Sequence, residues 1–453
     1  MVTRRDFLKL VAAAGGAFAV GAGGVWYYFS TRPEAPARTT LHFTGWTYDV
    51  AKVQQNIAVF EKWTEDRDDL PDIGISFANS DFGGFSDFMS ARFVAGTPND
   101  VCYSSDHWLA KWADAEWIVP IDDYKPEVRN YLPQFEEFSK DGVLYNGKMY
   151  GLPYYTDVMT FEWNVEMMSE AGFDEIPSTW EEVTEQALAM KQKGLADYPL
   201  NLTFSATPWL EETFFAMVYS RGGRTFDEGL DPLFDTSEES IEALQWVVDA
   251  FQTHKILSPA TVESAVLEVK EGMKNGDIAG TVLAGYYMGE VNSVGISPMA
   301  GKVDIGLMPG TTHETCGWMR FYGMGKSAVD NDVVDEAYLL LEFLGGKVDL
   351  DEPGEYVWYV PRRWAVENVL GFSALPLWED EDVIGAFTRA FPSVDTLKQQ
   401  RSLAMLKQGF RAPWYPEWVT TNRAEIQKAI LGTKSVEDAL KDSADEWRRL
   451  SAA

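Results

Sequence analysis

Apolar residues recur along the chain with two different periods. Residues 39–46 alternate apolar and polar side chains, which predicts a half-buried strand. In residues 50–66, Val53, Ile57 and Phe60 are three or four positions apart, which places them on one face of a helix. Two further strands are predicted at 72–79 and 101–105, with a helix between them at 85–93. This strand–helix–strand rhythm predicts an α/β fold with a largely parallel sheet.

The most informative segment is 151–183. It opens with Gly-Leu-Pro and continues through tyrosines into a β-rich run at 158–163. A short amphipathic helix is predicted at 165–171, ended by Gly172. The next helix starts at Trp180. Thr179 as N-cap and Glu182 three residues later form the pattern of a capping box.

Turn and helix signals define the rest of the chain. Asn146-Gly147 predicts a hairpin with a type I′ turn across 144–150. Further strands are predicted at 199–204, 276–283 and 303–309. Further helices are predicted at 108–115, 180–192, 237–252, 262–275, 332–343 and 435–449.

The order of these motifs resembles family 1 extracellular solute-binding proteins, the carbohydrate receptors of ABC importers. The 151–183 segment matches the place where that family crosses between two lobes, with Trp163-Asn164 standing where Tyr-Asn is usual. Residues 95–101, 117–123, 303–309 and the last helix match further family motifs in the same order. The resemblance therefore covers residues 40–450. Tyr286 or Tyr287 replaces a tryptophan of the family pattern.

The resemblance implies a two-lobed periplasmic-binding-protein-like fold, in which each lobe is a mixed sheet flanked by helices. Three hinge crossings are expected, near Asp157, Val303 and Gly345. One lobe would comprise residues 39–157 and 303–345, and the other residues 158–302 and 346–453, with residues 1–38 as a leader.

Charge and aromatic content narrow the function. The chain carries 70 acidic and 38 basic residues, a net charge of −32, which phosphate backbones repel; we therefore expect no nucleic-acid partner. Aromatic residues make up 14% of the chain, including 17 tryptophans, more than a core requires. Such rings suit a carbohydrate-binding cleft.

The N-terminus resembles an export signal. Residues 3–9 contain Arg4-Arg5 in a twin-arginine pattern, and residues 10–30 carry no charge. Ala35-Pro36-Ala37 could be cleaved, whereas the aromatic residues 26–29 could anchor the chain in a membrane, and both alternatives stay open. Either way we expect an extracytoplasmic protein. Whether Cys102 and Cys316 form a disulfide also stays open.

A sugar site combines aromatic faces with planar polar groups. Such side chains follow several predicted strands and crossings, where open α/β sheets bind ligands. Asp157 stands where the family's hinge carboxylate contacts sugar. The alternatives are core packing for the aromatic rings, a hinge ion pair for Asp157, and helix capping for Ser104 and Asp106. The candidate ligand-binding residues are Trp46, Tyr48, Ser104, Asp106, His107, Asp157, Trp209, Tyr286, Tyr287, Trp318, Arg320 and Trp414.

We expect no cofactor, no metal and no catalysis. The four histidines are scattered without metal-ligand spacing, and Gly323–Ser327 lacks the first glycine of a phosphate loop. The predicted function is a monomeric substrate-binding protein that delivers a mono- or oligosaccharide to an ABC permease. The alternatives are a secreted glycoside hydrolase, or the same fold binding glycerol phosphate, a polyamine or a peptide. Asn201-Leu202-Thr203 is a glycosylation sequon whose use stays open.

Overall fold

The structure is a computed structural model that describes residues 38–46, 48–350 and 352–453. The predicted leader lies outside the described residues. Within the described part of the chain, no helix is both long and apolar enough to cross a bilayer.

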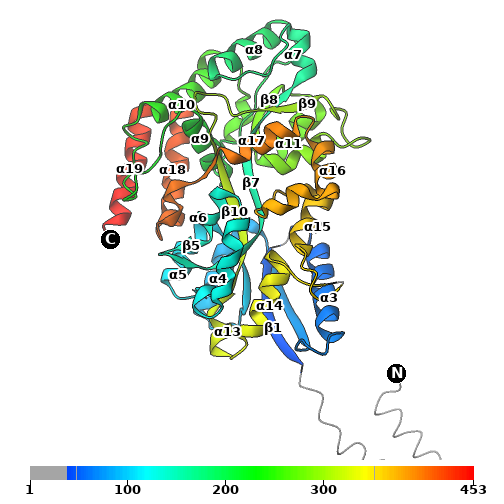
Figure 1. Cartoon of the computed structure of the whole chain (residues 1–453). Helices are drawn as coiled ribbons and strands as arrows, with labels where there is room; N and C mark the ends of the chain where they lie inside the picture. The colour runs from blue at the N-terminus through cyan, green and yellow to red at the C-terminus, as the bar shows by residue number, and fades with distance from the viewer. Residues whose placement is uncertain (1–37, 47, 351) are drawn as a thin grey trace, which may run out of the picture.

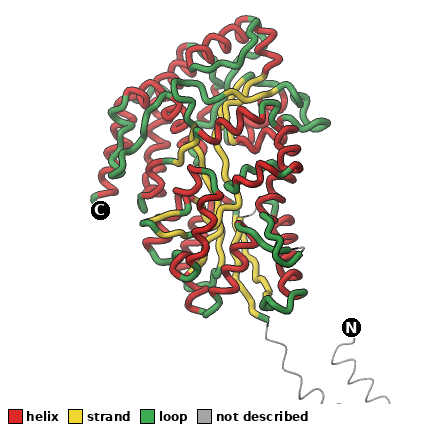
Figure 2. Tube along the Cα trace, in the orientation of Figure 1, coloured by secondary structure: helices red, strands yellow, loops and turns green. Residues whose placement is uncertain are grey.

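Two halves are stacked end to end and joined by long central strands (Figures 1 and 2). The main strand order is β2-β1-β3-β10-β7-β8, while β4 and β11 also pair with β10, and β9 pairs with β7. We call the part built on β1, β2 and β3 the first half and the part built on β8 and β9 the second half. The strands are β1 (Thr39–Trp46), β2 (Ile73–Ser80), β3 (Val101–Ser105), β4 (Ile118–Val119), β5 (Leu144–Tyr145), β6 (Lys148–Met149), β7 (Gly151–Asn164), β8 (Gly280–Ala284), β9 (Val303–Gly306), β10 (Thr315–Gly325) and β11 (Ala404–Leu406).

Strand β7 belongs to both halves. Its first part, Gly151 to Val158, pairs antiparallel with β10, and the part from Met159 onward pairs with β8 and β9. All its residues are buried, because both faces are covered. This explains the unbroken apolar and aromatic run in the sequence. The chain therefore passes from one half to the other at Asp157 and Val158.

Helices cover the sheet on both sides (Figure 1). In the first half, α14 packs on β7 and β10, and α3 packs on β2. In the second half, α9 packs on β10, and α10 packs on α18 and α19. The helices are α3 (Val50–Glu65), α4 (Phe82–Val94), α5 (Asp106–Asp114), α6 (Glu137–Gly142), α7 (Val165–Ala171), α8 (Trp180–Gln192), α9 (Trp209–Ser220), α10 (Glu238–Val248), α11 (Val266–Asn275), α12 (Met288–Val291), α13 (Lys326–Asp330), α14 (Val334–Gly345), α15 (Tyr359–Asn368), α16 (Glu381–Ala390), α17 (Val394–Ser402), α18 (Tyr415–Ile430) and α19 (Val436–Ser451).

Local sequence signals are confirmed where they depend on neighbouring residues alone. Thr179 accepts from the Glu182 backbone N–H, and the Glu182 side chain accepts in return, so α8 starts with the predicted capping box. Asn146 and Gly147 both have positive φ, as a type I′ turn requires. Parallel pairing of β1 with β2 and β3 is also confirmed, although β10 and β7 run antiparallel and make the sheet mixed.

Three expectations need correction. Residues 199–204 form no strand, because only Leu200 makes bridges, to Leu257 and Gly280. The crossing predicted near Val303 lies later, since β9 still pairs with β7 in the second half. The chain returns to the first half with β10. A short apolar strand can extend either sheet, and its sequence does not say which.

The third predicted crossing, near Gly345, also lies later. Helix α15 packs on α14, and Arg363 in α15 donates hydrogen bonds to Asn56 and Gln55 of α3. The backbone N–H of Thr156 donates to the carbonyl of Gly371, which places that residue beside the first crossing. The stretch from Gly345 to Gly371 therefore stays in contact with the first half.

Two open questions from the sequence receive an answer. Cys102 and Cys316 are both buried and free, so they form no disulfide. Asn201 is buried, and its side-chain oxygen accepts a hydrogen bond from Thr261. A glycan at this sequon would require local unfolding.

Candidate functional site

Aromatic rings from both halves meet at the crossing strands. Trp46, at the end of β1, stacks on Tyr48 with ring centroids 5.2 Å apart. Tyr48 in turn lies 6.5 Å from Tyr286 of the short helix η5 (Gly285–Tyr287), which follows β8 in the second half. Tyr155 on β7 lies 6.0 Å from Tyr286. Aromatic side chains of the two halves therefore meet at the crossing strands.

The ring contacts continue through the second half and return to β10 of the first half. Tyr287 lies 4.1 Å from Tyr286 and 6.2 Å from Trp209, at the start of α9. Trp209 meets Trp318 of β10 edge to face at 5.5 Å. We call Trp46, Tyr48, Tyr155, Trp209, Tyr286, Tyr287 and Trp318 the aromatic cluster.

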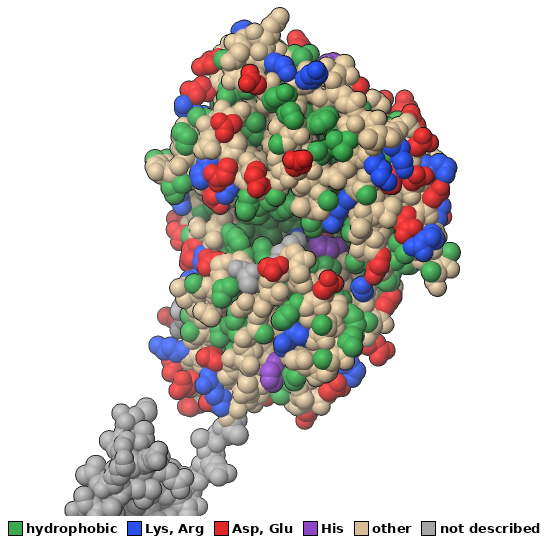
Figure 3. Space-filling model, turned by 180° about the vertical axis from the view of Figure 1, so that it is seen from behind, with side chains coloured by type: hydrophobic (Ala, Val, Ile, Leu, Met, Phe, Trp, Pro, Cys, Tyr) green, Lys and Arg blue, Asp and Glu red, His purple; other side chains and the backbone are tan. Residues whose placement is uncertain are grey.

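Part of the aromatic cluster is accessible to solvent. Trp46, Tyr48, Trp209 and Tyr286 are partly exposed, whereas Tyr287 and Trp318 are buried. The space-filling view shows a hollow between the two halves that is lined with hydrophobic side chains (Figure 3). The four partly exposed rings can therefore be reached by a ligand from solvent.

Asp157 links this cluster to the hinge. Its Oδ2 accepts hydrogen bonds from the Tyr286 backbone N–H (3.1 Å) and the Tyr155 hydroxyl (3.2 Å). Arg401 lies 3.7 Å from its Oδ1. Burial raises the pKa of Asp157 to about 6, and Arg401 limits the rise. Asp157 is therefore largely ionised at neutral pH and holds η5 against β7.

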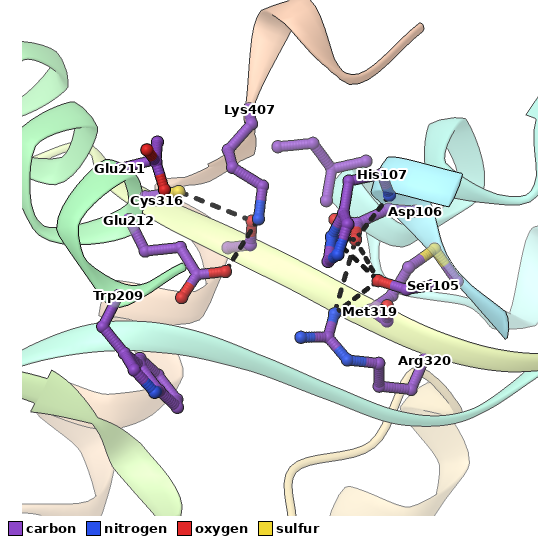
Figure 4. Close-up of polar contacts among 12 residues, drawn as sticks. Ser105, Asp106, His107, Trp209, Glu211, Glu212, Cys316, Met319, Arg320 and Lys407 are labelled. Atoms are coloured by element: carbon purple, nitrogen blue, oxygen red, sulfur yellow. Dashed lines mark hydrogen bonds and ion pairs between the residues drawn. The ribbon is translucent and has the colours of Figure 1, made fainter. Parts of the chain in front are cut away.

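A polar cluster lies at the start of α5 (Figure 4). Asp106 Oδ1 accepts from the Ser105 hydroxyl at 2.8 Å and lies 3.4 Å from Arg320 Nη1. Arg320 also donates to Ser105 Oγ at 2.9 Å, and His107 Nδ1 lies 3.0 Å from the same oxygen. Burial lowers the pKa of His107 to about 4, so this imidazole is neutral at pH 7.

Opposite this cluster is a buried ion pair (Figure 4). Lys407, between β11 and the short helix η7 (Gln408–Arg411), donates to Glu212 of α9 at 2.7 Å, and both side chains are only 2% exposed. Burial alone would raise the pKa of Asp106, but Lys407, His107 and Arg320 together hold it well below its usual range. Lys407 is therefore electrostatically coupled to Asp106 without touching it.

The structure brings most of the predicted site residues together. Trp46, Tyr48, Trp209, Tyr286, Tyr287 and Trp318 lie in the aromatic cluster, with Asp157 bonded to two of its members. Asp106, His107 and Arg320 form the polar cluster. Ser104 and Trp414 do not join either group.

Ser104 is buried on the face of β3 opposite Ser105, because successive side chains of a strand alternate. Trp414 contacts Trp447 of α19 at 5.6 Å. It also lines a separate groove of about 1300 Å³ whose wall includes Tyr145 and Arg224.

Sequence reasoning missed four residues. Ser105 could have been found from strand alternation with Tyr103, and Tyr155 from its position two residues before Asp157. Nothing in the sequence indicates Lys407 and Glu212. The two residues are remote from each other in the chain, and the sequence does not distinguish a buried lysine from an exposed one.

Comparison with known proteins supports the resemblance. Residues 53–347 match the model of the family described as bacterial extracellular solute-binding protein. An arabinooligosaccharide-binding protein of Halalkalibacterium halodurans is 29% identical over 55% of this chain, and the match spans only 55% of that relative's length. One from Bacillus subtilis is 23% identical, covering 71% of this chain and 73% of the relative.

Solved structures show the same fold. A maltose-bound MalE3 of T. maritima superposes with a TM-score of 0.75 at 19% identity, covering 91% of this chain and 100% of that one. An ABC substrate-binding protein from Listeria monocytogenes in complex with cycloalternan gives 0.73 at 16% identity, covering 92% and 99%. The two-lobed α/β fold implied by the motif order is thereby confirmed, and the family match extends over well over half of the chain. The chain belongs to the bacterial extracellular solute-binding protein family.

Proposed function

We propose that this protein is the extracytoplasmic substrate-binding component of an ABC importer, and that it binds a mono- or oligosaccharide between its halves. The observation that carries the proposal is the aromatic cluster, in which rings of both halves meet. A hollow lined with hydrophobic side chains also lies between the halves (Figure 3). Flat aromatic faces pack on the C–H faces of sugar rings. Relatives named for arabinooligosaccharides and a structure bound to maltose support a carbohydrate ligand.

Ligand binding would favour a closed arrangement of two lobes. We propose lobe borders near Val158, Thr315 and Gly371, following the strand pairings and the α15 contacts, with β11 returning to pair with β10 of the first lobe. A ligand that contacts both lobes only when they are closed shifts the population toward that form by the difference in contact energy. The permease would then accept the closed, loaded form.

We infer that the protein does not hydrolyse its ligand. A glycoside hydrolase needs a carboxylic acid that is free to donate a proton, together with a second carboxylate. The buried carboxylates near the cleft each face a cation: Asp106 faces Arg320, Glu212 faces Lys407, and Asp157 faces Arg401. This pairing supports a binding role.

Export and assembly are also proposals. The twin-arginine pattern at Arg4-Arg5 supports export of the folded protein, and the family description supports a location outside the cytoplasm. We propose that it acts as a monomer with its permease as partner.

A thermal-shift screen with neutral oligosaccharides tests the function. We expect arabino- or malto-oligosaccharides to raise the unfolding temperature, with no shorter sugars appearing in the mixture by chromatography. Trp209→Ala should remove most of the shift. Release of shorter sugars would favour an enzyme, and a shift only with peptides, polyamines or glycerol phosphate would favour a different solute.

A further inference from the structure

Beside the cleft, one buried carboxylate oxygen has no hydrogen-bond partner among the described residues. Asp106 is fully buried. Its Oδ1 accepts hydrogen bonds from the Ser105 hydroxyl, the His107 backbone N–H and Arg320. Its Oδ2 is buried and accepts no hydrogen bond from the described residues. An unsatisfied buried carboxylate oxygen costs free energy, so a hydrogen-bond donor that a ligand brings to this atom would recover that cost.

Lys407, in contrast, has more hydrogen-bond donors than it has acceptors among the described residues. An ammonium group has three N–H donors. Among the described residues, Lys407 forms a hydrogen bond and an ion pair with Glu212 alone. It forms no direct ion pair with Asp106, although its charge helps to keep that carboxylate ionised. The two groups approach the same space above β10 from opposite sides (Figure 4).

The charges around this space balance. Arg320 and Lys407 are positive, and Asp106 and Glu212 are negative. A hydroxyl group can accept from an ammonium and donate to a carboxylate at the same time, so one hydroxyl satisfies both partners. A carboxylate or phosphate of a ligand could only accept, and because the charges already balance, its own charge would be buried without compensation at a high electrostatic cost.

We propose that Lys407 and Asp106 hold one hydroxyl group of a neutral carbohydrate between them, so that this end of the cleft selects neutral sugars over uronic acids and sugar phosphates. Glu212 is a positioning residue, since it fixes the Lys407 ammonium from α9. This inference rests on the proposed function and deepens it, because it names the class of sugar and a lysine that no sequence motif indicated.

The first experiment compares two ligands that differ only in charge. The best neutral oligosaccharide from the screen is titrated into the purified protein by calorimetry at pH 7.5. It is compared with the same oligosaccharide in which one primary alcohol is oxidised to a carboxylate. We expect the oxidised form to bind at least about tenfold more weakly, as burial of an unpaired charge requires.

The second experiment removes the ion pair. Lys407→Met combined with Glu212→Gln leaves no unpaired buried charge, so folding is protected. This variant should lose roughly 10- to 100-fold in affinity for the neutral sugar, the range for one hydrogen bond to a charged group. Asp106→Asn should reduce the difference in affinity between the neutral and the oxidised oligosaccharide. The control is Lys302→Met with Glu166→Gln, an exposed pair at 2.8 Å that should leave affinity unchanged.

The outcomes separate the two proposals. If no saccharide binds the wild-type protein, the proposed function fails and this inference fails with it. If a neutral saccharide binds but the oxidised form binds equally well, only this inference is overturned. Unchanged affinity in the Lys407→Met, Glu212→Gln variant would also overturn it, since water alone would then occupy the space.

Discussion

The ion pair between Arg401 and Glu136 predicts a large stability loss when only one partner is removed. Arg401 Nε and Nη2 donate to the two carboxylate oxygens of Glu136 at 2.7 and 2.6 Å. The same guanidinium donates to Thr156 Oγ1 at 2.7 Å and to the carbonyl of Phe372 at 3.0 Å. These bonds join α17, the segment before α6 and the crossing strand β7. Both charged side chains are buried, with exposures of 2% and 7%.

Arg401→Met would leave Glu136 buried without its cation. Removing one partner of a buried ion pair costs about 3–5 kcal/mol, because the remaining charge must be desolvated or neutralised. We expect a loss of this size in the free energy of unfolding, measured in urea at pH 7.5 by both circular dichroism and tryptophan fluorescence. Arg401→Met with Glu136→Leu should recover only part of the loss, since both charges of this pair are then absent but Asp157 still lacks its cation.

The chain contains a matched control for this experiment. Arg449 also binds one glutamate with two bonds, donating to Glu446 at 2.7 and 2.6 Å. This pair lies on the surface of α19, where water and salt screen it. Arg449→Met should therefore cost much less than Arg401→Met. Equal losses for the two variants would refute the reasoning that burial determines the magnitude.

Further predictions concern the cleft and the second half. Trp209→Ala should weaken binding of the best neutral sugar roughly 10- to 100-fold by calorimetry, since a ring face against the ligand is lost; an unchanged affinity would remove Trp209 from the site. Burial raises the pKa of Glu162 well above its usual 4.5, so the folded state holds a proton that the unfolded state releases. The wild type should therefore lose stability relative to Glu162→Gln as pH rises above the usual 4.5, and parallel urea-denaturation profiles would contradict this. Gly280→Ala would bring its Cβ to 2.1 Å from the Trp163 ring, which should destabilise the protein by about 1–3 kcal/mol in the same assay. Thr179→Ala should cost about 1 kcal/mol through loss of the α8 cap, and no change would show that the cap is redundant.

The sequence predicted two kinds of feature: those that depend on neighbouring residues, and those indicated by the order of motifs along the chain. The capping box at Thr179, the positive φ values at Asn146 and Gly147, and the strand at 39–46 depend on residues that are neighbours in the chain. The collinear motifs added the two-lobed fold, because their order along the chain is itself specific. Most of the aromatic cluster was predicted too: Trp46 ends β1, and Tyr286 and Tyr287 directly follow β8, as ligand-binding side chains of open α/β sheets do.

Which half a segment joins was decided by its tertiary contacts, and its own sequence did not indicate it. Strand β9 joins the second half through its pairing with β7, and residues 199–204 find no partner strand, although both segments have similar apolar patterns.

For the charged residues, too, the sequence determined the composition and the tertiary structure determined the pairing. By itself the sequence determined that the chain is acidic, rich in aromatic residues and built from alternating strands and helices. Only the tertiary structure decided that Lys407 lies beside Glu212 and that Arg401 lies beside Glu136, pairs separated by 195 and 265 positions. The physical reason is that burial and charge pairing depend on distances in space, which the packing of the two halves sets.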